Sequence, residues 1–123
     1  MKDKICERLE STIQSKLEEL RIDWNISAVK KQGESYYVEL EFYSNAGEDF
    51  VFTIWCDGTF KDFLHELWAY SQEFDPDEHA EMWVDMRGQN GVPDSIRTLI
   101  DDADAIGKEL EDTALKLQGR ESK

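Results

Sequence analysis

The chain has 123 residues and carries 28 acidic against 14 basic residues, for a formal net charge of −14. Its length suits a single domain, and a hydrophobic content of 40% with 11% aromatic residues excludes an intrinsically disordered acidic tail. This charge would be repelled by nucleic acid phosphates and by an anionic membrane surface. The composition therefore disfavours direct binding to either and favours a basic protein partner.

Cysteine usage and the N-terminal sequence indicate a cytoplasmic protein. Cys6 and Cys56 lie far apart with no CxxC spacing, so the sequence suggests neither a zinc ribbon nor a disulfide scaffold and fits two reduced thiols. Residues 1–17 alternate charged and apolar side chains and lack the apolar core of a signal peptide. No run of residues is apolar enough for a membrane span, so we expect a cytoplasmic location and no membrane partner.

The first apolar residues recur at helical spacing, in a stripe made by Ile5, Leu9, Ile13, Leu17 and Leu20. This stripe predicts an amphipathic helix from about Asp3 to Ile22. From Trp24 the apolar period changes to two, which predicts strands over residues 24–31, 36–43 and 48–55. Their expected inward-facing residues are Trp24, Ile26 and Ala28 in the first strand, Tyr36, Val38, Leu40 and Phe42 in the second, and Phe50, Phe52 and Ile54 in the third.

The connections KQGE and SNAGE are short and contain glycine, so the strands should form an antiparallel meander with one dry and one wet face. On the wet face of the second strand, two carboxylates alternate with two phenols, in the order Tyr37, Glu39, Glu41 and Tyr43. This face should remain open to a partner.

Three helices are predicted after the sheet. The first has Thr59 as its N-cap, in a variant capping box with Asp62, and should run to about Gln72. The second, over residues 75–87, begins with an N-cap aspartate, a proline and a glutamate at the third helical position, and Gly88 ends it. The third starts at residues 93–95 and carries its apolar stripe on Ile96, Leu99, Ile100, Ala103, Ile106, Leu110, Ala114 and Leu117.

These elements give an α+β fold: an N-terminal helix, a three-stranded antiparallel sheet and three C-terminal helices that cover one face of the sheet. No linker or internal repeat divides the chain. We expect a single domain over residues 1–118, followed by a frayed tail over residues 119–123.

Metal chemistry is poorly supported by the sequence. His79-Ala80-Glu81 matches the H-x-E part of a zinc deaminase, but the P-C-x-x-C that completes the zinc site is missing. His79 with Asp75, Glu78 and Glu81 offers another possible metal site, yet the chain has no calcium loop, no HExxH and no set of three histidines. We therefore predict no metal or other cofactor.

Catalysis without a metal is no better supported. The chain has no G-x-S-x-G elbow and no phosphate-binding loop, and neither cysteine has a sequence cue for a histidine partner. Glu39 and Glu41 have the residue types for acid and base catalysis, but a solvated strand face is the simpler interpretation. The prediction is a protein without enzyme activity.

Acidic residues are concentrated in the second half of the chain, where residues 75–112 include a single lysine, Lys108. Carboxylates at helical spacing lie about 5–6 Å apart, which is comparable to the phosphate pitch of about 3.4 Å along a nucleic acid strand. Such a surface can occupy a groove built for DNA or RNA. The expected partner-binding residues are Glu39, Glu41, Asp75, Asp77, Glu78, Glu81, Asp85, Asp94, Asp101, Asp102, Asp104 and Glu111. The alternative is that the charge serves only solubility.

The segments EFYSNAGEDFVFTIW and FDPDEHAEMWVDMRGQNGVPDSIRTLIDDAD resemble small acidic proteins of phages and conjugative elements of Gram-positive gut bacteria. Compact acidic proteins of such elements include anti-CRISPR and anti-restriction proteins. The resemblance implies a non-enzymatic inhibitor that mimics nucleic acid inside a bacterial host and blocks a defence nuclease, with a CRISPR effector such as a Cas nuclease favoured. The alternative is an accessory module that binds a protein through Tyr37, Tyr43 and Trp55.

Overall fold

The computed structural model describes residues 3–43, 49–79 and 96–119, and only the backbone of residues 96–100. Its elements are α1 (Lys4–Glu19), β1 (Asn25–Gln32), β2 (Ser35–Tyr43), β3 (Asp49–Cys56), α2 (Phe60–Glu73) and α4 (Ile96–Leu117). The chain is also helical at residues 76–79, where the second described stretch ends. The α+β class is confirmed: an N-terminal helix, a three-stranded antiparallel sheet and further helices follow in the predicted order.

Helix α1 begins where Asp3 caps it, since its Oδ1 accepts hydrogen bonds from the backbone N–H groups of Ile5 (2.7 Å) and Cys6 (3.3 Å). It ends at Glu19 rather than near Ile22. Arg21 adopts a left-handed φ of 57°, and the Ile22 N–H bonds back to the Leu17 carbonyl at 2.8 Å. This closure is a Schellman motif, and it turns the chain toward the sheet.

The sheet has the order β1-β2-β3, with both neighbouring pairs antiparallel. The predicted inward-facing residues of β2 and β3 are buried, as is Trp24 just before β1. They meet the apolar stripes of the helices in one core, where the Trp24 and Phe42 rings stack at 5.1 Å and the Phe52 and Tyr70 rings stack at 5.1 Å. Period-two patterning thus predicted the inward-facing residues of these two strands correctly.

The prediction for Ala28 is wrong. The register of β1 against β2 shifts between Ile26 and Ala28, so that Ile26 opposes Leu40 on the core side whereas Ala28 opposes Glu39 on the outer side. The extra residue, Ser27, forms a bulge that reverses the alternation beyond it. Val29, which opposes Val38, therefore takes the place in the core that the pattern assigned to Ala28.

Helix α2 starts at the predicted cap, because Thr59 Oγ1 accepts a hydrogen bond from the Asp62 N–H at 3.1 Å. The Asp62 carboxylate does not return to Thr59; it accepts from the Asp57 N–H at 2.9 Å. Between these residues, Gly58 adopts a φ of +97°, in the region that favours glycine. The two hydrogen bonds of Asp62 therefore connect the whole turn from β3 into α2.

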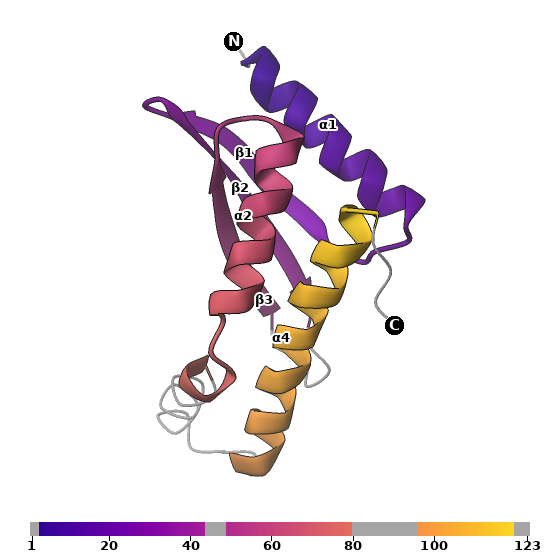
Figure 1. Ribbon diagram of the computed structural model, residues 1–123, viewed down its shortest axis with the longest axis vertical. Helices are drawn as coiled ribbons and strands as arrows, with labels where there is room; N and C mark the ends of the chain where they lie inside the picture. Colours follow the sequence, from indigo (N-terminus) through magenta and orange to yellow (C-terminus); the bar gives the residue numbers. More distant parts are fainter. Residues whose placement is uncertain (1–2, 44–48, 80–95, 120–123) are drawn as a thin grey trace.

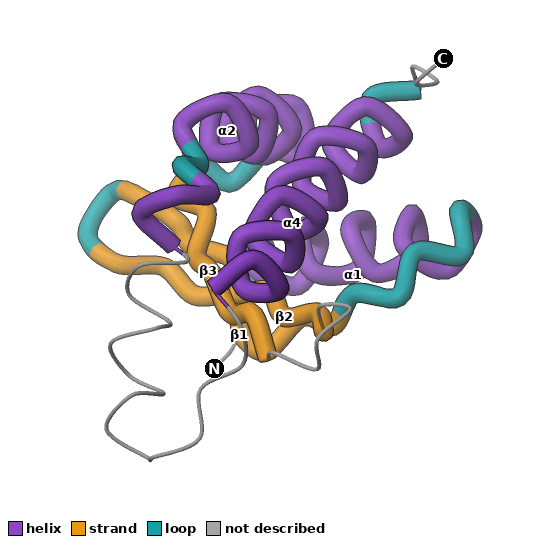
Figure 2. Tube along the Cα trace, turned by 90° about the horizontal axis from the view of Figure 1, so that it is seen from below, coloured by secondary structure: helices purple, strands orange, loops and turns teal. Residues whose placement is uncertain are grey.

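Helices α1, α2 and α4 lie on one side of the sheet, and the core sits between them and the strands (Figures 1 and 2). Along the long axis, α1 lies at one end and the 76–79 turn at the other (Figure 1). None of the helices in the described stretches is both long and apolar enough to cross a membrane.

Candidate functional site

The outer face of the sheet, opposite the helices, is organised by strand register. Tyr37 of β2 lies between Lys30 of β1 and Trp55 of β3, and the Tyr37 and Trp55 rings are 5.1 Å apart. Farther along β2 come Glu39, Glu41 and finally Tyr43, which is 65% exposed. Val51 and Trp55 of β3 are each 47% exposed. The outer face thus has the Tyr37 and Trp55 rings at one end, Tyr43 at the other end, and the two carboxylates of β2 between them.

Two of these carboxylates lie on neighbouring strands. Asp49 is the first residue of β3 and lies diagonally across from Glu41, which opposes Val51. A hydrogen bond between the two carboxyl groups raises the pKa of Glu41 above its ordinary value, and partial loss of hydration and the charges of Asp49 and Glu39 raise it further. Negative charge is therefore crowded at this end of the outer face.

A pocket of about 550 Å³ connects the outer face to the end of α2. Its carboxylates are Asp49, Glu73, Asp75 and Glu78, and its less polar lining is Phe50, Val51, Tyr70, Phe74 and His79. The ring of His79 packs edge-on to Phe50 at 5.4 Å and lies 5.5 Å from Phe74. The pocket brings a strand start and a helix end together, so the acidic residues of the sheet continue into those after α2.

The carboxylates that begin the 76–79 turn are exposed. Asp75 is its N-cap, because its Oδ1 accepts from the backbone N–H groups of Asp77 at 3.0 Å and Glu78 at 3.4 Å. We define the acidic band as Glu39, Glu41, Asp49, Glu73, Asp75, Asp77 and Glu78. Among the residues that the structure describes, no ion pair joins a lysine or arginine to any member of this band.

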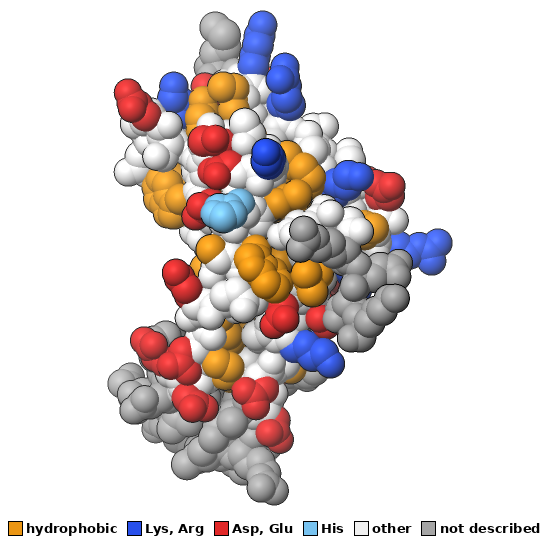
Figure 3. Space-filling view, viewed as in Figure 1, with side chains coloured by type: hydrophobic (Ala, Val, Ile, Leu, Met, Phe, Trp, Pro, Cys, Tyr) orange, Lys and Arg blue, Asp and Glu red, His pale blue; other side chains and the backbone are white. Residues whose placement is uncertain are grey.

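Helix α4 adds charge beside the band. Gly107 faces the Phe74 ring and Pro76, so α4 passes the helical turn at residues 76–79 at this point. The two turns of α4 that precede Gly107 carry the exposed Asp101 and Asp104. In the space-filling view, acidic side chains gather over the lower part of the molecule, whereas lysine and arginine side chains lie mainly over its upper part (Figure 3). On this face of the molecule, the charge is thus unevenly distributed along the long axis.

The other predicted partner-binding residues lie elsewhere. Glu111 is exposed, several turns along α4 from Asp101. Asp102 is only 5% exposed, so its side chain does not belong to an acidic surface; it precedes Ile106 by four residues and lies on the buried stripe of α4. The predicted residues Glu81, Asp85 and Asp94 lie outside the described residues.

Sequence reasoning missed Asp49 and Glu73. For Asp49, the signal was the same alternation that placed Val51 and Trp55 on the outer face, since Asp49 precedes Val51 by two residues. Glu73 gave no signal, because only the packing of α2 against β3 brings it to the pocket.

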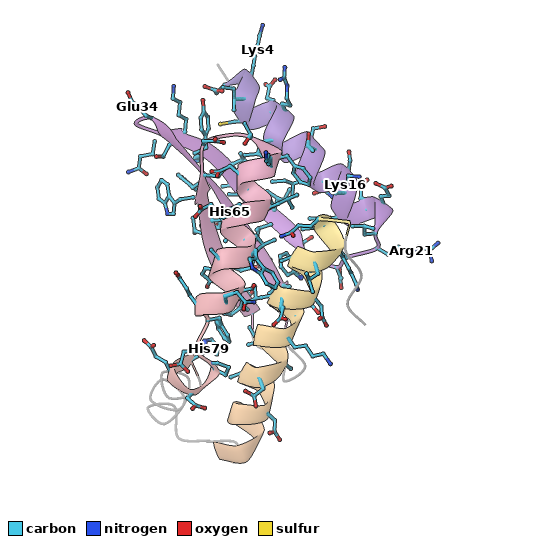
Figure 4. The ribbon with its side chains drawn as sticks, in the orientation of Figure 1. Lys4, Lys16, Arg21, Glu34, His65 and His79 are labelled. Carbon is cyan, nitrogen blue, oxygen red and sulfur yellow. The ribbon has the colours of Figure 1, made fainter. Side chains whose placement is uncertain are left out.

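In the part of the chain that the structure describes, the geometry brings no set of metal ligands together. The two histidines are well apart, with His65 on the middle of α2 and His79 beyond its end (Figure 4). Within residues 3–43, 49–79 and 96–119, no group of three or more histidine, cysteine, aspartate or glutamate side chains could hold a metal ion.

Comparison with known proteins adds no assignment: no family model matches the sequence, and no curated protein and no solved structure gives a significant match.

Proposed function

We propose that this protein is a non-enzymatic inhibitor that mimics nucleic acid and occupies the nucleic-acid channel of a bacterial defence nuclease, with a CRISPR effector favoured. The observation that carries the proposal is the acidic band. It runs from Glu39 and Glu41 on the outer face, through the pocket, to Asp77 and Glu78, and within the described part of the chain no lysine or arginine forms an ion pair with it.

The band has the physical features that a cationic channel selects. Its carboxylates are carried by β2, β3, the end of α2 and the helical turn at residues 76–79 with its N-cap, so little backbone conformational entropy is lost when they meet a partner. Crowding at Glu41 and Asp49 costs energy in the free protein. Arginine and lysine side chains of a channel would relieve that repulsion, and the uneven charge would steer the two proteins together.

The test is inhibition of nucleases in solution. The protein is titrated into guide-loaded CRISPR nucleases and restriction nucleases, and target DNA binding and cleavage are measured. Inhibition should saturate at a fixed ratio of protein to nuclease. Unchanged DNA binding and cleavage by all of them at excess protein would reject the proposal.

Charge variants make this test specific to the band. Glu39→Gln with Glu41→Gln removes two charges from the outer face, and Glu18→Gln with Glu34→Gln removes two exposed charges elsewhere. Because each exposed ion pair contributes up to about 1 kcal/mol, the first variant should inhibit about tenfold less well, and the second should match the wild type. An equal loss of inhibition in the two variants would show that inhibition depends on net charge and not on the position of the acidic band.

A second candidate function is supported by the exposure of Tyr43, Val51 and Trp55. An accessory protein of a mobile element would use these side chains as apolar anchors, with the charge serving only solubility. Ionic strength separates the two functions, since an electrostatic complex weakens steeply with salt and an apolar one hardly responds.

A further inference from the structure

The pocket at the start of β3 adds an apolar lining to carboxylates of the acidic band. Its lining is largely aromatic and aliphatic, from Phe50, Val51, Tyr70 and Phe74, and four carboxylates and His79 complete it. An anion would be repelled here. A neutral apolar ligand would cover the hydrophobic surface but would pair with none of the carboxylates. The lining therefore fits a cation that is flat and weakly hydrated.

We propose that this pocket binds the guanidinium group of an arginine side chain carried by the basic partner. A guanidinium stacks on aromatic rings, is more weakly hydrated than an ammonium group and donates several hydrogen bonds in a fixed plane, so it satisfies both parts of the lining. Lysine would bring a compact, strongly hydrated charge that an apolar surface does not accommodate. This inference rests on the proposed function, because it names how that partner is held.

The pocket is held in place by its own packing. The Phe74 N–H, at the end of α2, donates to the Tyr70 carbonyl at 3.0 Å, and the Phe74 ring meets Phe50 edge-on at 5.8 Å. Tyr70 stacks on Phe52 in the core. Burial raises the pKa of the Tyr70 phenol above its ordinary value, further from pH 7. An arginine that enters meets a preformed surface.

The direct experiment uses short peptides and the full chain. Three peptides of the same length and sequence, with arginine, lysine or neutral citrulline at one position, are titrated into ¹⁵N-labelled protein, and backbone amide shifts are followed by NMR. The arginine peptide should give saturable shifts over Asp49–Val51 and Tyr70–His79. The lysine peptide should bind at least about threefold more weakly, and citrulline should give no saturable shift. Equal binding of arginine and lysine, or shifts elsewhere only, would overturn the inference.

A matched pair of variants completes the experiment. Glu73→Gln with Glu78→Gln removes two charges from the pocket, and Asp101→Asn with Asp104→Asn removes two from α4 outside it. The first pair should weaken binding of the arginine peptide at least about fivefold, and the second by less than about twofold. An equal loss in both pairs would show a response to net charge alone and would overturn the inference.

The pocket and the proposed function can fail separately. If the protein inhibits a nuclease but the Glu73→Gln, Glu78→Gln variant inhibits equally well and the arginine peptide does not bind, the pocket inference is wrong and the proposed function stands. If the peptide binds as expected but no nuclease is inhibited, the proposed function is wrong, and the pocket is an arginine site for a different basic partner.

Discussion

The indole Nε1 of Trp24 donates a hydrogen bond of 2.9 Å to Oε2 of Glu109, and this oxygen also accepts a bond of 3.2 Å from Thr113 Oγ1. Trp24 precedes β1 and is 4% exposed, whereas Glu109 lies on α4, 85 positions later. One glutamate therefore ties the long C-terminal helix to the start of the sheet. Its role in the molecule is structural.

Replacing this glutamate should destabilise the fold. Glu109→Ala leaves the buried Trp24 N–H without its acceptor, and an unsatisfied buried donor costs about 1–3 kcal/mol. The free energy of unfolding, measured by urea denaturation, should fall by this amount. Glu111→Ala, at an exposed position on the same helix, should change it by less than about 0.5 kcal/mol. Equal stability of the two variants would contradict a structural role for Glu109.

Glu109 and Glu111 lie on the same helix but have different roles, and this difference shows which features can be predicted from the sequence. Strand alternation placed β2 and β3 correctly because their inward residues are uniformly apolar. The charge of an acidic residue does not show in the same way whether its side chain faces the core or the solvent. Asp102 is buried and Glu109 holds an indole, although in the sequence both are simply further acids on a polar helix face. Their roles depend on contacts between distant segments, which local patterns do not encode.

The same limit applies to the candidate site. The outer-face carboxylates Glu39 and Glu41 followed from alternation in β2, and Asp75 and Glu78 followed from a helix-start pattern. That these two groups meet at one pocket depends on how α2 packs against β3. The Ser27 bulge is a similar case, since nothing in NISAVKK distinguishes a bulged strand from a regular one.

The turn between β3 and α2 should tolerate no side chain at Gly58. A Cβ there would lie 2.7 Å from Ile5 Cγ2 and 2.9 Å from the Tyr36 ring, and φ is +97°. Gly58→Ala should therefore lower the free energy of unfolding by about 3 kcal/mol, combining backbone strain with a steric clash. Thermal and urea denaturation would measure the loss.

Gly33 is the matched control for this substitution. It also has a positive φ, of +64°, but a Cβ added there would meet no atom within 4 Å. Gly33→Ala should therefore cost only the backbone strain, about 1–2 kcal/mol. If both variants lost the same stability, crowding by Ile5 and Tyr36 would have no energetic role at Gly58.

The carboxyl pair on the outer face should make stability depend on pH. The pKa of Glu41 is raised above 4.5 in the folded protein, chiefly by its hydrogen bond with Asp49, so the native state keeps a proton that the unfolded chain releases. The stabilisation from this proton is fully present below pH 4.5 and is lost as the pH rises through the raised pKa.

Asp49→Asn tests this linkage. The variant removes a neighbouring charge, and its amide can donate to the ionised Glu41, so the pKa of Glu41 should fall. NMR titration of the Glu41 side-chain carboxyl carbon would measure the change. Unfolding experiments across the same pH range should show a smaller loss of stability with rising pH in the variant than in the wild type. An unchanged Glu41 pKa would show that the Asp49 carboxyl does not perturb it.

The salt dependence of the complex should identify which part of the outer face holds the partner. If carboxylates carry the binding, the dissociation constant of the wild type should rise at least about tenfold between about 50 and 200 mM salt, because exposed charges are screened over about 10 Å. Tyr43→Ala with Trp55→Ala should weaken binding by a similar factor at every salt concentration, which leaves the slope unchanged. Glu39→Gln with Glu41→Gln should instead make the slope shallower. The opposite result would be a wild-type dissociation constant that does not change with salt, together with loss of binding in the Tyr43→Ala, Trp55→Ala variant. It would show that the outer face binds an apolar partner, because hydrophobic contacts persist when charges are screened.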